Sequence, residues 1–279
     1  MPAVAVYVVG TAGSGKSTFV GSFAEWAASA DFDVLTVNLD PGAEEVPYNP
    51  DIDIRDSIRL IDIMKEHRLG PNGAQIVAAD MLALETDRLR ELIENDGAAI
   101  ALIDTPGQIE LFAFRSASQQ IVSAVTEHAA LLQLFDPMLS RSAPGFVSQL
   151  MLAATVQFRF QTPFIPVLSK ADLLPEEEVD QIRKWSESGE TLFDALDLSS
   201  PGADAPVPEA KRAGPGKSQP MTAQLARELL KVYESLGVYR NLIPVSSQTP
   251  FGFEDVYSAL RLVFFGGEDP DPTGAGQKM

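Results

Sequence analysis

Short, almost wholly apolar runs alternate along the chain with longer segments of helical periodicity. The runs are β-branched or apolar, and several are apolar at nearly every position, which is typical of strands covered on both faces of a sheet. We expect strands over residues 3–9, 33–38, 98–103, 129–135, 164–168 and 242–245. We expect helices over residues 16–29, 57–67, 80–95, 114–127, 143–160, 176–187, 221–236 and 253–264.

This alternation predicts an α/β fold in three layers, a mainly parallel sheet with helices on both faces. No internal repeat and no second apolar core interrupts it, so we expect one domain over residues 1–265. Residues 201–220 differ, with five prolines, three glycines and no aromatic residue, a composition that cannot bury a core. We therefore expect a flexible insertion within about 190–220 and a disordered tail over 266–279.

The first expected strand runs into GTAGSGKST, which fits the phosphate-binding pattern of a glycine, four residues and then Gly-Lys-Ser. Its glycines let backbone N–H groups turn toward phosphate oxygens, and the next helix adds its positive N-terminal end. Lys16 is expected to reach the β- and γ-phosphates, and the Ser17 hydroxyl to complete a Mg²⁺ shell. The expected phosphate-binding residues are Gly13, Ser14, Gly15, Lys16, Ser17 and Thr18. The motif narrows the α/β prediction to the P-loop NTPase fold.

The third expected strand runs into DTPGQIE, residues 104–110. An aspartate at the tip of a buried strand, facing a phosphate loop, commonly holds Mg²⁺ directly or through water, and this role is expected of Asp104. Gly107 suits a backbone contact to the γ-phosphate, and Gln108 could orient the attacking water. DTPG alone could be an ordinary turn, but its place after the phosphate loop favours a nucleotide hydrolase over a kinase.

A candidate base-recognition element, SKAD, follows the fifth expected strand. The carboxylate of Asp172 could accept hydrogen bonds from both N1–H and the 2-amino group of guanine, a pair of donors that adenine lacks. The stem of Lys170 would then cover the face of the base. After the sixth strand, Ser246 or Ser247 could supply a backbone contact to the guanine oxygen, and Ser246 is taken as the candidate.

Two further acidic residues each have more than one possible role. Asp40 ends the NLDP segment after the second strand, where it could ligate Mg²⁺ through water, help to position the attacking water or cap a turn. Asp53, in DIRD, could cap the following helix or face the metal. The sequence alone does not choose between these roles.

The chain has 39 Asp and Glu against 21 Lys and Arg, a net charge of −18. Its field repels phosphate, so nucleic acid and anionic membrane are not expected as partners. No cysteine and only two histidines are present, which excludes disulfides, thiolate metal sites and multi-histidine sites. Surplus carboxylates are typical of proteins in concentrated salt, where the Debye length is about 3 Å at 1 M. No apolar run is long enough to span a bilayer, and we expect a cytoplasmic, halophilic protein.

Five segments of the chain resemble, in their order, the motifs of the GPN-loop GTPases: GTAGSGKST, NLDP, DIRD, DTPGQIE and SKAD. The deciding feature is the Gly-Pro-Asn tripeptide at 70–72, between DIRD and DTPGQ. By itself such a tripeptide is a tight turn. The resemblance covers residues 3–265 apart from the insertion. One departure is Ser169, where other GTPases commonly have asparagine.

The resemblance implies a homodimeric GTPase that uses Mg²⁺, hydrolyses GTP to GDP and phosphate, and switches conformation with its nucleotide. In the family each subunit's GPN loop reaches the partner's active site, so Asn72 is expected to act in trans. Asp40, Asp104 and Gln108 would place the water, and Ser17 with the two aspartates would hold the metal. A role in assembling a protein complex, with an unknown client, is expected. A small-molecule kinase or an ATPase on the same fold is the alternative.

Overall fold

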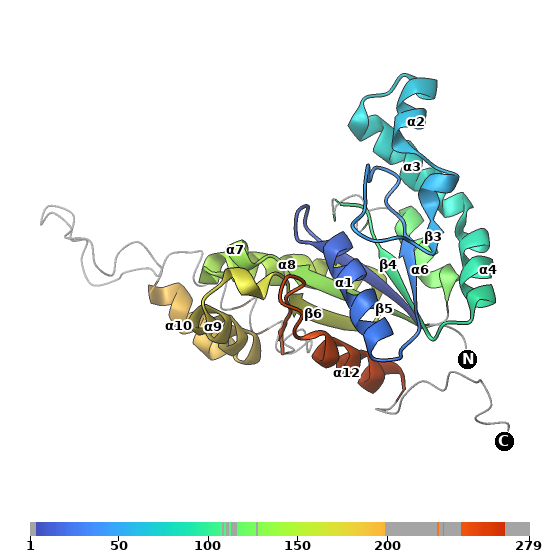
Figure 1. Ribbon diagram of the computed structural model, residues 1–279. Helices are drawn as coiled ribbons and strands as arrows, with labels where there is room; N and C mark the ends of the chain where they lie inside the picture. Colours follow the sequence, from blue (N-terminus) through green and yellow to red (C-terminus); the bar gives the residue numbers. More distant parts are fainter. Residues whose placement is uncertain are drawn as a thin grey trace, which may run out of the picture.

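A parallel sheet of seven strands lies at the centre of the computed structural model, within the residues that it describes (Figure 1). Those residues are 4–107, 109, 112, 116–126, 128–198, 228, 231 and 241–265. The strand order is β3-β2-β4-β1-β5-β6-β7. The strands are β1 (Val4–Gly10), β2 (Val34–Asn38), β3 (Ile52–Asp53), β4 (Ile100–Asp104), β5 (His128–Phe135), β6 (Phe164–Leu168) and β7 (Ile243–Pro244). The expected P-loop NTPase fold is confirmed.

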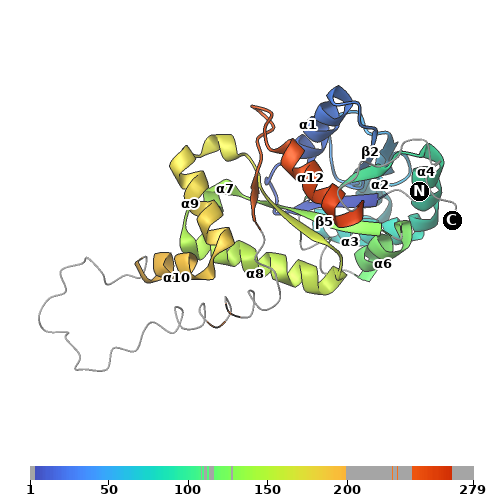
Figure 2. The same ribbon diagram turned by 90° about the horizontal axis from the view of Figure 1, so that it is seen from below.

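Helices cover both faces of this sheet, with α1 and α12 together on one side (Figure 2). The helices are α1 (Lys16–Ser29), α2 (Leu60–His67), α3 (Pro71–Leu84), α4 (Thr86–Asp96), α6 (Ser116–Val125), α7 (Pro137–Ser140), α8 (Ala143–Phe160), α9 (Glu176–Glu187), α10 (Gly189–Leu198) and α12 (Phe253–Phe264). Two short 3₁₀ helices are η1 (Ile54–Asp56) and η2 (Ala171–Leu173). In the part of the chain that the structure describes, no helix has the length and apolar character needed to cross a membrane.

Alternate residues of the strands supply two separate apolar cores, because successive side chains of a strand point to opposite faces. In β1, Tyr7 packs into the core of one face and Val8 into the core of the other. The second core includes Phe19 and Phe23 of α1 and Phe253 of α12, whose rings contact one another. Both faces of the central strands are thus buried, which explains why their sequence is apolar at nearly every position.

The register of the sheet brings the phosphate loop and the DTPG segment together. β1 lies between β4 and β5, and Val8 pairs with Asp104 at the end of β4. β2 lies on the other side of β4, with Asn38 paired with Asp104. Because all three strands end at the same edge, the segments after β1, β2 and β4 surround one site.

Several expected boundaries differ from the structure. β3 was not expected, and α3 begins at Pro71 rather than near residue 80. The first residues assigned to the insertion, from 190 onward, continue the helix α10, because its apolar side packs against α8 and α9. The remainder of that insertion, 199–220, and the tail over 266–279 lie outside the described residues, as does most of the expected helix 221–236.

Candidate functional site

The phosphate loop joins β1 to α1 and depends on two glycines with left-handed backbone. Gly13 has φ 78° and Gly15 has φ 93°, a region that side chains disfavour. Gly15 is also the N-cap of α1, and neither a side-chain cap nor an acidic residue occupies the first turn. The first N–H groups of α1 are therefore left for an anion, which the helix dipole favours.

The ammonium group of Lys16 is buried between the phosphate loop and the DTPG segment. Its Nζ donates to the carbonyl oxygens of Gly10 at 3.1 Å, Thr11 at 3.2 Å and Gly107 at 2.9 Å. These bonds hold a positive charge at the centre of the loop. The expected phosphate-binding lysine is thus in place, and it also connects the loop to Gly107.

Asp104 ends β4 and is 1% exposed. Its Oδ2 accepts a hydrogen bond from the Tyr48 hydroxyl at 3.2 Å, while its Oδ1 is buried without a hydrogen-bond partner. Burial raises the pKa of Asp104 to about 6, although the Ser17 hydroxyl and Lys16 act to lower it. Burial and the neighbouring Asp104 also raise the pKa of Tyr48, which keeps its hydroxyl a neutral donor. Tyr48 was not among the residues expected from the sequence.

The donor set suits Mg²⁺ in the manner expected of a nucleotide site. Mg²⁺ is usually bound through one or two carboxylates together with substrate phosphates and water. Asp104 offers a buried oxygen that lacks a partner, and the Ser17 hydroxyl lies beside the same carboxylate. Among the described residues, no group of three or more His, Cys, Asp or Glu forms a cage for a metal ion. The fit therefore rests on Asp104 and Ser17 with phosphate oxygens.

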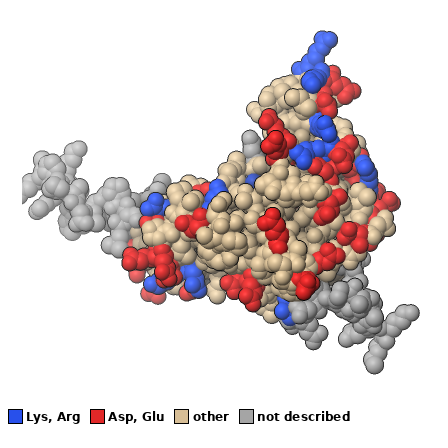
Figure 3. Space-filling model, viewed as in Figure 1, with Lys and Arg blue, Asp and Glu red and all other residues tan. Residues whose placement is uncertain are grey.

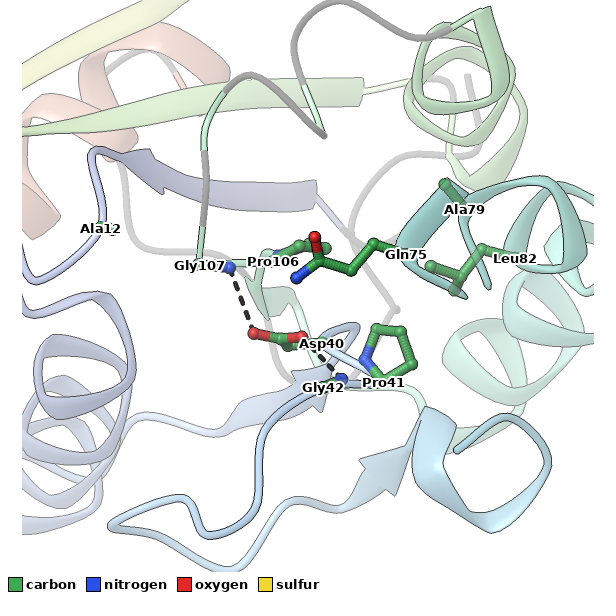
Figure 4. A pocket seen from close by; sticks show the side chains of 9 residues that line it. All are labelled: Ala12, Asp40, Pro41, Gly42, Gln75, Ala79, Leu82, Pro106 and Gly107. Carbon is green, nitrogen blue, oxygen red and sulfur yellow. Dashed lines mark hydrogen bonds between the residues drawn. The ribbon is translucent and has the colours of Figure 1, made fainter. Parts of the chain in front are cut away.

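Asp40 caps a turn and ties two segments of the site together. Its Oδ1 accepts from the N–H of Gly42 at 2.8 Å, and its Oδ2 accepts from the N–H of Gly107 at 3.1 Å (Figure 4). Both carboxylate oxygens thus accept hydrogen bonds from backbone N–H groups. Of the roles expected for Asp40, the one seen in the structure is that of a turn cap. It also joins the segment after β2 to the segment after β4.

A cavity of about 260 Å³ opens beside Asp40. Its lining residues are Ala12, Asp40, Pro41, Gly42, Gln75, Ala79, Leu82, Pro106 and Gly107. Figure 4 shows the amide of Gln75 extending from α3 toward Pro106 and Gly107. Gln75 was not expected from the sequence, because it lies in a largely apolar helix. Gln108, the expected water-orienting residue, lies outside the described residues.

A second cavity, of about 360 Å³, lies beside the phosphate loop. It is lined by Ser14, Gly15, Thr18, Phe19, Ser169, Lys170, Asp172, Leu173, Val245, Ser247 and Gln248. Lys170 adopts a left-handed backbone with φ 49°, and its Nζ donates to Gly13 O at 2.6 Å. Its Cε lies 3.2 Å from the position that a Cβ on Gly15 would occupy. The SKAD segment therefore contacts the phosphate loop directly.

Ser246 is not positioned for the base contact expected of it. Its N–H donates to Phe251 O at 3.2 Å, and its Oγ accepts from the N–H groups of Gln248 and Thr249. The residue is fully buried and stabilises the turn that it begins. Ser247 lines the cavity instead, so it is the better placed of the two serines for the expected contact with a base.

Asp53 caps η1 rather than facing the metal. It accepts hydrogen bonds from the N–H of Arg55 and from the Asn38 amide, and its Oδ2 forms an ion pair with Arg55 at 2.6 Å. Burial by itself would raise the pKa of Asp53, but these hydrogen bonds outweigh it and hold the pKa below its ordinary value. Arg55 also donates to Ala43 O and Glu44 O, which anchors the loop that follows Asp40.

Asn72 lines neither of these two cavities of its own chain. Gly70 is the N-cap of α3 and Pro71 occupies its first turn, so the tripeptide starts a helix instead of forming a free turn. α2 and the start of α3 rise together from the body of the molecule (Figure 1), and the Asn72 side chain is exposed there. Within one chain, α3 thus carries Gln75 to the first cavity and leaves Asn72 out of both linings.

The parallel α/β sheet, with a phosphate-binding loop between β1 and α1 and a base-sized cavity beside it, defines a P-loop nucleotide-binding protein. The profile of a family described as "Conserved hypothetical ATP binding protein" matches residues 8–264. A GPN-loop GTPase from Pyrococcus abyssi is 35% identical over 198 residues, which cover 69% of this chain and 77% of that protein. The chain therefore belongs to the GPN-loop GTPase family, as the motifs predicted.

Two further comparisons extend this likeness over most of the chain. GPN-loop GTPase 1 of Saccharomyces cerevisiae is 29% identical over 255 residues, 90% of this chain, and the chain spans 63% of that relative's length. The crystal structure of the P. abyssi GTPase in its apo form superposes with a TM-score of 0.79 at 28% identity. That match covers 95% of this chain and 99% of the P. abyssi chain.

Proposed function

We propose that the protein is a Mg²⁺-dependent nucleotide switch that hydrolyses GTP to GDP and phosphate. The observation that carries the proposal is the position of Lys170. Its Nζ bonds to Gly13 of the phosphate loop while its stem lies along the base-sized cavity. A base stacked on that stem and phosphates wrapped by the loop would therefore belong to one bound nucleotide.

The base preference rests on Asp172, which lines the same cavity from η2. Its carboxylate can accept both hydrogens on the edge of guanine, whereas the N1 of adenine would face it as a second acceptor. The family profile is described as ATP binding, and the curated relatives are named GTPases. Asp172 supports the second description, and an ATPase remains the alternative for a direct test.

The chemistry assigned to the chain is the stabilisation of a transferring phosphoryl group. Lys16 and the N–H groups at the start of α1 would bind the phosphate oxygens. The Gly107 N–H, which donates to Asp40 in this structure, would have to exchange that bond to contact the γ-phosphate. Ser17 and Asp104 would hold Mg²⁺, which when bound neutralises charge that develops on the phosphate oxygens. Positioning of the attacking water is assigned to Gln108 with Asp40 and Asp104, as the family resemblance implies.

We further propose a homodimer in which Asn72 acts on the nucleotide of the partner. In support, the side chain is exposed at the start of a helix that rises from the body of the molecule, and it lines neither cavity of its own chain. A second copy could therefore receive it. A nucleotide-dependent dimer of this kind would act as a switch in assembling a protein complex whose client is unidentified.

The test is phosphate release from GTP and from ATP, with Mg²⁺ and with EDTA. Magnesium-dependent release from GTP in preference to ATP, abolished in Lys16→Ala, is expected. Release from ATP in preference would replace the GTPase by the ATPase alternative. Nucleoside diphosphate produced without free phosphate, in the presence of small-molecule acceptors, would instead indicate a kinase.

A further inference from the structure

Tyr48 links three parts of the nucleotide site that are distant in sequence. It lies in the loop between β2 and β3, and its hydroxyl donates to Oδ2 of Asp104 at 3.2 Å. Its Cβ would lie 3.1 Å from a Cβ built on Gly21 of α1. The ring is thus packed against the helix that begins at the phosphate loop, while the hydroxyl reaches the carboxylate at the end of β4.

The two oxygens of Asp104 have different surroundings. Oδ2 is bonded to Tyr48, whereas Oδ1 is buried and has no hydrogen-bond partner, although the Ser17 hydroxyl lies beside the same carboxylate. A carboxylate held at one oxygen cannot rotate freely about its Cβ–Cγ bond, so the free oxygen keeps one direction. Mg²⁺ demands near-ideal ligand geometry, and hydrogen bonds from neighbouring groups commonly orient the ligating residues.

The loop that carries Tyr48 is itself anchored near both ends. Arg55 donates to the carbonyl oxygens of Ala43 and Glu44, and the Asp51 carboxylate accepts from the backbone and side chain of Thr36 at 2.8 and 2.7 Å. These contacts bracket Tyr48 in sequence. The hydroxyl therefore reaches Asp104 from a supported loop rather than from a free one.

We propose that Tyr48 is a positioning residue for the metal site: its hydroxyl holds Asp104 so that Oδ1 is directed at the cation. The inference rests on the proposed Mg²⁺-dependent nucleotide binding. It differs from a competing role, in which the hydroxyl would occupy Asp104 and have to leave when the cation binds. The two roles predict opposite effects of removing the hydroxyl.

The first experiment is Tyr48→Phe, which deletes the hydroxyl and keeps the ring against Gly21. The probe is a fluorescent GDP analogue, titrated with Mg²⁺ and also measured in EDTA. The magnesium midpoint should rise about tenfold, the order expected for one hydrogen bond to a charged group. Affinity in EDTA should not change. In hydrolysis, the magnesium requirement should rise while kcat at saturating Mg²⁺ stays near that of the unmodified protein.

Tyr7→Phe is the matched control, because it also deletes a buried tyrosine hydroxyl. That hydroxyl donates to Ile121 O at 3.4 Å within the core of one face of the sheet. Its loss should leave the magnesium midpoint unchanged, even if thermal stability falls. A shift of the midpoint in both variants would mean that it reports general destabilisation, and would overturn the specific role of Tyr48.

Gly21→Ala offers an independent perturbation that keeps every polar group. The added Cβ would lie 3.1 Å from the Cβ of Tyr48, so Tyr48 must shift by a few tenths of an ångström, and the magnesium midpoint should rise by a smaller factor than in Tyr48→Phe. An unchanged or lower midpoint in Tyr48→Phe would overturn the positioning role while leaving the proposed function intact. GTP hydrolysis that is independent of Mg²⁺ in the unmodified protein would overturn both.

Discussion

Replacing Asp172 by asparagine tests which base the protein selects. η2 holds the residue in place through the N–H of Ala171, which donates to Val245 O at 3.0 Å, and through the left-handed backbone of Lys170. The substitution is nearly isosteric and the side chain is exposed in its cavity, so we expect the fold to be unaffected. The change is then confined to the atoms that face the base.

The expected magnitude follows from the hydrogen bonds exchanged. The carboxylate can accept from both N1 and the 2-amino group of guanine, whereas an amide keeps one acceptor and turns its own N–H₂ toward the other donor. Losing one charge-assisted hydrogen bond costs about 2–3 kcal/mol, or roughly 30- to 160-fold in affinity for GDP. Xanthine presents an oxygen where guanine has the amino group, so XDP should bind Asp172→Asn more tightly than GDP.

Competition against a fluorescent GDP analogue by GDP, XDP and ADP measures these affinities in one assay. Asp180→Asn on α9 is the control, because it makes the same charge change at an exposed residue that lines neither cavity. If Asp172→Asn kept its preference for GDP, guanine selection could not depend on this carboxylate. A preference of the unmodified protein for ADP over GDP would contradict guanine selection directly.

Asn72→Ala should lower turnover about 100-fold, the cost of removing one preorganised donor, with nucleotide affinity unchanged. Asn95→Ala, at another exposed asparagine, should leave turnover unchanged. Equal turnover in the two variants would contradict the proposed role of Asn72 in trans. Arg55→Ala should lower the melting temperature at about pH 7, because hydrogen bonds from Arg55 lower the pKa of Asp53 in the folded protein and so stabilise the fold above the ordinary pKa of that carboxyl. This contribution is lost as the pH falls through the pKa of Asp53 in the folded protein, so the difference in melting temperature should shrink progressively below about pH 4. A gap that stayed constant with pH would contradict this. Raising KCl from about 0.1 to 1 M, which shortens the Debye length from about 10 to 3 Å, should raise the melting temperature by relieving repulsion among the surface carboxylates; a fall would contradict the halophilic expectation.

The parts of the site found from the sequence are those with a strictly local cause. Gly13 and Gly15 both adopt positive φ, so the phosphate loop needs glycine at those positions whatever surrounds it. Lys16 follows in the first turn of α1, and Asp104 is the last residue of a wholly buried strand. Strand ends meet at one edge in a parallel sheet, and this rule alone brings the three segments together.

The parts that were missed depend on contacts between distant segments. Tyr48 reaches Asp104 across 56 positions of sequence from a loop that has no periodic pattern. Gln75 enters its cavity only because α3 begins at Pro71, whose place directly after an N-cap glycine was a usable helix signal. Ser246 and Ser247 could be told apart only once Phe251 was seen to bond with the first of them.

An acidic chain can still hold a triphosphate, because the charges that matter are those closest to the phosphates. On the face shown in Figure 3, Asp and Glu are spread widely over the surface, and at physiological ionic strength charges separated by more than about 8 Å are largely screened. Within the loop itself the charge is positive: Lys16 and Lys170 both bond to loop carbonyls, and no acidic residue lies in the first turn of α1. Asp40 is neutralised in part by two backbone N–H groups. The net charge of −18 should therefore act on the rate at which nucleotide arrives and on solubility, while affinity is set within the loop.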